Sequence, residues 1–177
     1  MDSRNKKQFD NIPLMTKISL LKKRRYSIGD VFCVPLAEKG YCLGLITHIH
    51  PRTKVPLGWF FRKLYDQIPT IRDSEIINKG NVILVKRFGI QGFDEDTWRI
   101  ISKLDTFDKA EWPIPVFLRR PGSTPACFVY YNEDMEETGS ENIPEGTDLS
   151  LYYEDGIGGS GFVEKRLTRL FLQNSLV

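Results

Sequence analysis

Residues 29–46 have the sequence Gly29-Asp30-Val31-Phe32-Cys33-Val34-Pro35-Leu36-Ala37-Glu38-Lys39-Gly40-Tyr41-Cys42-Leu43-Gly44-Leu45-Ile46. Two apolar runs, rich in β-branched and aromatic residues, lie on either side of a short polar turn at residues 37–40. This arrangement predicts a two-stranded antiparallel β-hairpin. Within it we expect Val31 or Phe32 to be buried and the turn near Lys39 and Gly40 to be exposed. Pro35 has no backbone N–H, so we expect it on an edge strand or at a bulge.

The chain beyond this hairpin alternates short apolar segments with turns rich in Pro, Gly and Asp. Such spacing favours an antiparallel sheet or barrel. The expected strands are Asp30–Leu36, Tyr41–His50, Gly58–Asp66, Asn81–Phe88, Thr97–Lys103, Pro115–Arg119, Ala126–Tyr131 and Asp148–Tyr153.

Two helical segments complete the expected fold. Asp73 can cap a short internal helix that ends before Gly80. Near the end of the chain, apolar residues recur at helical spacing and predict one amphipathic helix; its periodic positions are Phe162, Val163, Arg166, Leu167, Leu170 and Phe171. The predicted fold class is α+β, predominantly β: a twisted antiparallel sheet or open barrel covered by the C-terminal helix.

Composition indicates an ordinary soluble protein. The chain has 177 residues, 41% of them hydrophobic and 27% charged, which suits one globular domain. It shows neither an apolar run long enough to span a bilayer nor a signal-peptide pattern, so we expect a cytoplasmic protein. In that compartment Cys33, Cys42 and Cys127 are expected to be buried thiols, although Cys33 and Cys42 can face each other across the hairpin.

Charge divides the chain into an arm and a domain. Residues 1–25 contain eight basic and two acidic residues, so this arm has a formal charge of +6. The segment 133–155 contains nine acidic residues and no basic one. We expect residues 1–25 to form a basic N-terminal arm and residues 26–177 to form a single β-rich domain that includes the acidic segment.

Two motifs suggest binding chemistry, and both fail on context. Gly156-Ile157-Gly158-Gly159-Ser160-Gly161 fits the dinucleotide fingerprint, but the 16 residues that follow it are too few for the rest of that fold. His48 and His50 would share one face of a strand, but no third metal ligand is near in sequence. We expect a glycine turn before the last helix, surface histidines, and neither a metal nor a cofactor.

No grouping of residues in the sequence indicates a catalytic site. A nucleophile such as Cys33 or Cys127 would need one of the two histidines as its base and a carboxylate to orient it. No such grouping stands out in the sequence, so we expect a protein without enzymatic activity.

The hairpin also resembles a known family. Gly-Asp-Val-Phe, Pro35-Leu36, the polar turn, Gly40-Tyr41 and Gly44 resemble the opening of the immunity protein 26 family of bacterial polymorphic toxin systems. The likeness continues more weakly through Trp59–Asp66, Thr97–Ile101 and Trp112–Leu118, and does not extend beyond Arg120. It implies a protein that binds a cognate toxin domain and blocks it.

The resemblance gives the acidic segment a role. Many such toxins are nucleases with basic substrate clefts, and a carboxylate-rich loop complements a basic cleft and speeds association. We therefore expect the toxin-binding surface to include Glu133, Asp134, Glu136, Glu137 and Glu141.

An alternative function uses the other end of the chain. Lys22, Lys23, Arg24 and Arg25 can track phosphates, with Trp59, Phe60 and Arg62 as stacking surfaces. This would make the protein a small nucleic-acid-binding module. We favour a solvated arm and core aromatic residues, because Trp59–Leu64 has the hydrophobic density of a buried strand and the acidic segment repels nucleic acid.

Overall fold

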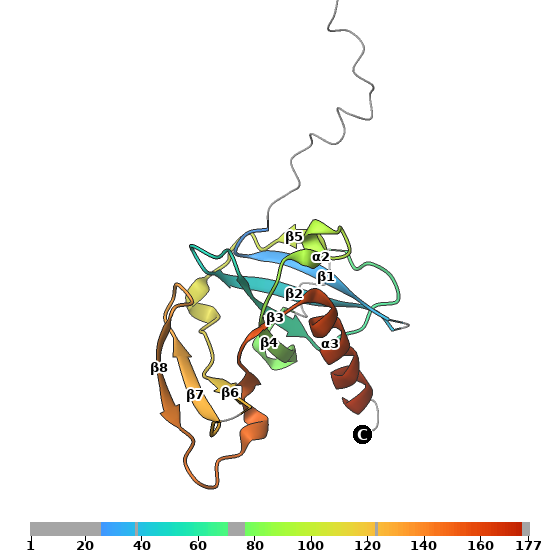
Figure 1. Ribbon diagram of the computed structural model, residues 1–177. Helices are drawn as coiled ribbons and strands as arrows, with labels where there is room; N and C mark the ends of the chain where they lie inside the picture. The colour runs from blue at the N-terminus through green and yellow to red at the C-terminus, as the bar shows by residue number, and fades with distance from the viewer. Residues whose placement is uncertain (1–25, 38, 71–76, 123, 175–177) are drawn as a thin grey trace, which may run out of the picture.

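The computed structural model describes residues 26–37, 39–70, 77–122 and 124–174, which form two β-sheets and one long helix (Figure 1). The predicted class, α+β with β predominating, is confirmed. The sheets do not close into a barrel within these residues. No described helix is both long enough and apolar enough to cross a membrane.

The larger sheet, sheet A, has six strands in the order β10-β4-β3-β2-β1-β5. All neighbours are antiparallel except β10 and β4, which are parallel. The strands are β1 (Asp30–Leu36), β2 (Gly40–Ile49), β3 (Pro56–Phe61), β4 (Val82–Phe88), β5 (Arg99–Lys103) and β10 (Ile157–Gly158).

The smaller sheet, sheet B, has the order β8-β7-β6-β9, and its β6 and β9 are parallel. The expected antiparallel sheet is thus divided in the described residues into two sheets, each mainly antiparallel with one parallel pair. The strands of sheet B are β6 (Phe117–Arg119), β7 (Cys127–Tyr131), β8 (Glu137–Asn142) and β9 (Tyr153–Glu154).

The C-terminal helix is confirmed as α3 (Ser160–Asn174). A short helix that was not expected, α2 (Gln91–Asp94), precedes β5. The start of the predicted internal helix at Asp73 lies outside the described residues. Among the described residues there are also three 3-10 turns: η2 (Lys79–Asn81), η3 (Lys109–Glu111) and η4 (Leu149–Leu151).

The predicted hairpin is confirmed as β1 and β2. Val31 and Phe32 are both buried, and Lys39 is exposed. Pro35 was expected on an edge strand, but β1 lies between β2 and β5 and is not an edge strand of sheet A. The pairing of β1 with β5 ends at Cys33, however, so at Pro35 only β2 lies beside β1 and the missing N–H breaks no hydrogen bond to β5.

Sheet A is buried on both faces. On one face Phe32, Phe60 and Phe88 pack under α3. On the other face Trp59 and Phe61 pack in one core with Trp112, which precedes sheet B, and with Phe117 of β6. Burial on both faces explains why β1, β2 and β3 are apolar at nearly every position.

The two hairpin cysteines are separated by this arrangement. Cys33 packs in the core on the side of sheet B, and Cys42 packs in the core under α3. They therefore do not face each other, and both are free thiols. Cys127, the third free thiol, is half-buried rather than buried. Burial raises the pKa of the Cys33 thiol, and it raises that of Cys42 further.

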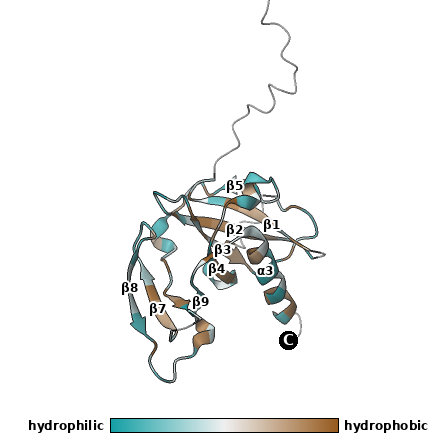
Figure 2. Cartoon of the chain, in the orientation of Figure 1, coloured by the Kyte–Doolittle hydropathy of each residue, from teal (hydrophilic) through white to brown (hydrophobic). Residues whose placement is uncertain are grey.

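Two expectations about the acidic segment were wrong. Residues 148–153 were expected to be a strand, but η4 occupies half of this range, with the Asp148 carboxylate accepting from the Ser150 amide, and only Tyr153 belongs to a strand, β9. Residues 137–142, expected in a loop, form β8, whose residues are all exposed. Figure 2 shows β8 in hydrophilic colours beside the more hydrophobic β7, which supplies the pairing that holds it.

One close contact fixes the packing under α3. Gly44 pairs with Phe32 across the hairpin, and a Cβ added to Gly44 would lie 2.4 Å from the Phe32 ring. The ring of Phe32 lies 5.2–5.7 Å from four other aromatic rings, so it has no free direction in which to move.

We expect Gly44→Ala to lower the free energy of unfolding by about 1–3 kcal/mol, because the added methyl overpacks the core beside Phe32. Urea unfolding followed by tryptophan fluorescence measures this. Gly139→Ala is the matched control, since a Cβ there meets no atom within 4 Å; its effect should stay within about 0.5 kcal/mol. Equal losses in both variants would contradict this account of the packing.

Candidate functional site

The turn between β7 and β8 is bonded to the rest of the molecule through Glu133. Its carboxylate lies 2.9 Å from Lys109 Nζ on η3 and 3.3 Å from His48 Nε2 on β2. The Lys109 ammonium also donates to the Glu133 carbonyl oxygen at 2.8 Å. The hydrogen bond and charge of Lys109 hold the pKa of Glu133 below its usual range.

His48 is fully buried, so the expectation of two surface histidines was wrong for this one. Its Nδ1 lies 3.0 Å from the Thr47 hydroxyl, opposite the bond to Glu133. Burial lowers the pKa of His48, and the charge of Lys109 lowers it further, against the opposing effect of Glu133. The neutral ring can donate to Glu133 while accepting from Thr47. His50 is half-buried at the end of β2 and accepts from the amides of the next turn.

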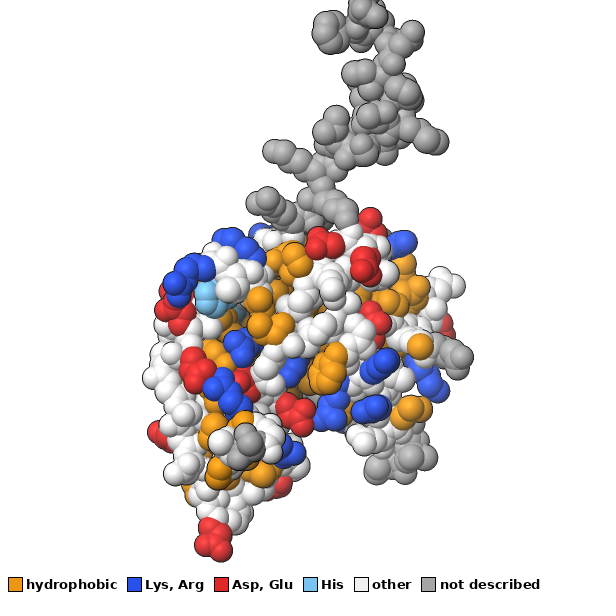
Figure 3. All heavy atoms as spheres, in the orientation of Figure 1, with side chains coloured by type: hydrophobic (Ala, Val, Ile, Leu, Met, Phe, Trp, Pro, Cys, Tyr) orange, Lys and Arg blue, Asp and Glu red, His pale blue; other side chains and the backbone are white. Residues whose placement is uncertain are grey.

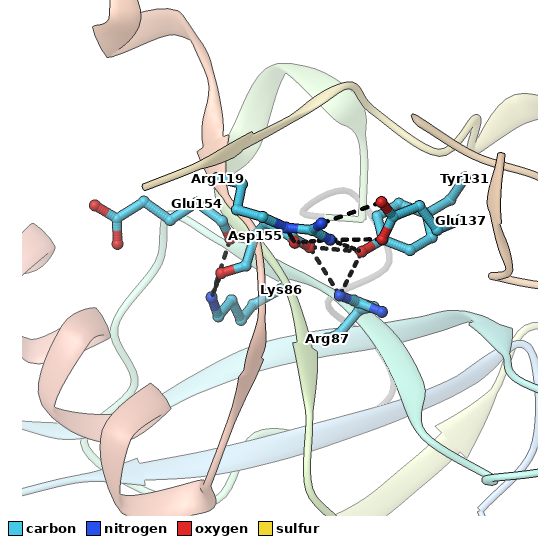
Figure 4. A network of polar contacts seen from close by, with 7 residues as sticks. All are labelled: Lys86, Arg87, Arg119, Tyr131, Glu137, Glu154 and Asp155. Atoms are coloured by element: carbon cyan, nitrogen blue, oxygen red, sulfur yellow. Dashed lines mark hydrogen bonds and ion pairs between the residues drawn. The ribbon is translucent and has the colours of Figure 1, made fainter. Parts of the chain in front are cut away.

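A network of charged groups joins the two sheets around Asp155 (Figure 4). Asp155 is 4% exposed and lies 2.8 Å from Arg87 of β4 and 2.7 Å from Arg119 of β6. The Tyr131 hydroxyl donates to the same carboxylate at 2.9 Å. Arg119 also binds Glu137 of β8 at 2.7 Å. Strands from both sheets are thus connected through one buried carboxylate.

Burial alone would favour the neutral form of Asp155. Hydrogen bonds from the Gly156 amide, Arg119 and Tyr131 outweigh that effect and hold its pKa below the usual range. Burial and the bond to Asp155 raise the pKa of Tyr131 to about 12. The network therefore has a fixed charge state at neutral pH, with Asp155 ionised and Tyr131 protonated.

Lys86 of β4 makes a second link to the same segment. Its ammonium donates to the carbonyl oxygens of Glu154 at 3.0 Å and Asp155 at 2.8 Å. The same group lies 5.7 Å from the centre of the Phe162 ring on α3. Burial lowers the pKa of Lys86, against the effect of the neighbouring carboxylates.

A cleft of about 570 Å³ lies between the sheets above this network. Its lining is His50, Arg52, Thr53, Val55, Arg87, Arg119, Tyr131, Met135, Glu136, Glu137 and Ile157. Figure 3 shows acidic and basic side chains next to one another on this side of the molecule, near a histidine. Each of the three arginines in the lining is bonded to a carboxylate of the same chain. The cleft is therefore nearly neutral and suits no single charged ligand.

The described residues do not form a metal site, because no group of three or more His, Cys, Asp or Glu side chains among them could hold an ion. The hydrogen bond between the Thr47 hydroxyl and His48 is of the kind that joins a nucleophile to its base in an enzyme. Both side chains are fully buried, however, so a substrate cannot reach them.

The family model described as Immunity protein 26 matches residues 27–125, which is more than half of the chain. This chain belongs to the immunity protein 26 family. The resemblance seen in the hairpin is thus confirmed, and the family places the chain among the immunity proteins. No curated protein and no solved structure gives a match.

The part matched by the immunity protein 26 family model contains β1 to β6, and all five carboxylates expected to bind the toxin follow it. They fall into two groups. Glu133, Glu136 and Glu137 each have a cationic partner in the same chain. Among the described residues, Asp134 and Glu141 form no ion pair, and Glu141 accepts only from the exposed Tyr130 hydroxyl.

The residues of the alternative function are not brought together. Lys22, Lys23, Arg24 and Arg25 lie outside the described residues. Trp59 and Phe60 are buried in the two opposite cores, so neither offers a stacking surface, whereas Arg62 is exposed.

The Gly156–Gly161 motif leads into α3, as expected of a glycine turn, and two of its residues also form β10. The network around Asp155 was missed altogether. Its members are 36 and 68 residues apart, and only the opposite charges of Arg87, Arg119 and Asp155 could have suggested it.

We expect the protein to lose stability as the pH falls below about 6.5. The unfolded chain then binds a proton on His48 that the folded chain accepts only at lower pH, because burial depresses its pKa. Melting temperatures between pH 5 and 7.5 should therefore fall less steeply in His48→Gln than in the wild type. An unchanged slope in His48→Gln would contradict the role of this residue.

We expect Asp155→Asn to cost on the order of 3 kcal/mol of stability, because Arg87 is only 16% exposed and loses its counter-charge. Glu136→Gln breaks the exposed pair with Arg52 and should cost less than about 1 kcal/mol. Chemical denaturation of both variants at neutral pH measures the difference. Similar small losses would show that the network does not hold the sheets together.

Proposed function

We propose that this protein neutralises a bacterial toxin domain by binding it, and that it catalyses no reaction itself. The observation that carries the proposal is the match of the immunity protein 26 family model to residues 27–125. The burial of Cys33 and His48, the groups best suited to be a nucleophile and a base, supports a binding role. The proposed setting is the cytoplasm of a bacterium that makes the cognate polymorphic toxin.

The surface that we assign to the toxin is the exposed acidic one formed by β8 and the turns on either side of it. Glu133, Glu136 and Glu137 are largely neutralised within the chain and support the shape of this surface. Asp134, Glu141 and Glu145 are exposed and form no ion pair with any described residue. These three carboxylates are therefore the ones able to attract a positively charged partner.

The negative charge of these exposed carboxylates favours a partner with a basic surface. No lysine or arginine occurs between Arg120 and Lys165, so the field around β8 is negative over a long stretch of chain. Such a field speeds association with a basic surface above the ordinary rate of about 10⁵–10⁶ M⁻¹s⁻¹ and slows it for an acidic one. A nuclease toxin with a basic substrate cleft has the matching chemistry.

The test is a triple charge reversal, Asp134→Lys, Glu141→Lys and Glu145→Lys, measured against the toxin domain encoded beside this gene. Because the three side chains form no internal ion pair, the fold should persist while like charges meet at the interface. We expect binding to weaken at least about tenfold, which is about 1.4 kcal/mol, mainly through a slower association rate. Surface plasmon resonance gives the rates, and survival during co-expression gives the protection.

The matched control places the same change in charge elsewhere, with Glu95→Lys, Asp105→Lys and Glu111→Lys, all exposed positions before β6. Protection and affinity should stay at the wild-type level in this variant. Equal loss in both variants would show that total charge acts rather than this surface. Failure of the wild type to protect would remove the proposed function for that toxin.

A further inference from the structure

The free edge of sheet B is a further candidate for recognition. β8 pairs with β7 from Cys127↔Asn142 to Tyr131↔Glu137, and no described strand lies on its other side. All six residues of β8 are exposed. The backbone N–H and C=O groups that point away from β7 therefore form an accessible row that another strand can use.

The other sheet edges are less suited to this. β9 and β10 contain two residues each, which is too short to pair stably with an added strand. The edge strand β5 has Arg99 and Lys103 at its ends, a common protection against pairing. β8 contains neither lysine nor proline.

The middle of β8 is open to close approach. Gly139 and Ser140 are small, and a Cβ added to Gly139 would meet no atom within 4 Å. The one irregularity in the β7–β8 pairing lies opposite Tyr130 and Tyr131, near the turn, so residues 139–142 are in continuous register with β7. This leaves a regular edge of four residues.

The charge around this edge selects the occupant. Glu141 lies on it, and Asp134 and Glu145 lie in the flanking turns without an ion pair to a described residue. A second copy of the chain would bring two such acidic edges together, which is unfavourable. An extended segment with lysine or arginine side chains fits both the backbone groups and the charge.

We propose that β8 accepts an extended basic strand of the toxin domain, which adds to sheet B through backbone hydrogen bonds. This inference rests on the proposed function and goes further than it. The backbone of β8 makes the main contact with the toxin strand, and the carboxylates select a strand that carries basic side chains. Side-chain identity at Thr138, Ser140 and Asn142 then matters little to binding.

Hydrogen–deuterium exchange on the wild-type protein, alone and with the toxin domain encoded beside its gene, tests the inference. We expect amides within residues 139–142 to exchange at least tenfold more slowly in the complex, while those of the β5 edge do not change. A complex that forms without slower exchange in β8 would overturn this inference and leave the proposed function standing. If no complex forms, the proposed function fails and this inference fails with it.

Two proline variants test the backbone directly. Amides of successive strand residues point to opposite sides, so in Ser140→Pro and Glu141→Pro one variant loses a bond to β7 and the other loses an edge N–H. We expect the variant that keeps its melting temperature to bind the toxin domain at least tenfold more weakly than the alanine variant at the same position. If that variant keeps its affinity, strand addition is overturned.

Discussion

The burial of sheet A on both faces is the constraint on which the rest of this structure depends. Successive residues of its central strands point into different cores, so one core needs α3 as a cover and the other needs sheet B. Each polar group caught between these layers needs a partner inside the protein. His48 finds Thr47 and Glu133, and Lys86 finds two backbone carbonyls.

These internal pairings decide which parts of the acidic segment remain available to another molecule. Glu133 and Glu137 are used to hold the β7–β8 hairpin against sheet A and β6. Of the carboxylates that form no ion pair with a described residue, Glu141 lies on β8, and Asp134 and Glu145 lie in the turns before and after this strand. A partner therefore meets a surface of fixed shape, and less ordering of the protein is needed when the two associate.

The hairpin and α3 could be predicted because burial sets their apolar patterns, nearly continuous in the hairpin and periodic in α3, and the family could be predicted from the hairpin residues. β8 could not, since Glu137, Gly139, Ser140 and Asn142 have low strand propensity and form a strand only because β7 offers a partner. The buried His48 is hydrogen-bonded to Glu133, which lies 85 residues away, so sequence spacing does not reveal this contact. For the candidate site, the sequence showed the charges but not which of them are neutralised within the chain.

The crossing segment between β9 and β10 has a consequence for how the protein is made. Within six residues the chain adds β9 to sheet B, contributes Asp155 to the network and adds β10 to sheet A, and α3 follows at once. These elements are synthesised after every strand that they join, so an emerging chain must wait with one face of sheet A uncovered. Neither sheet is complete until this segment has left the ribosome, so a chain that ends before it cannot form the full fold.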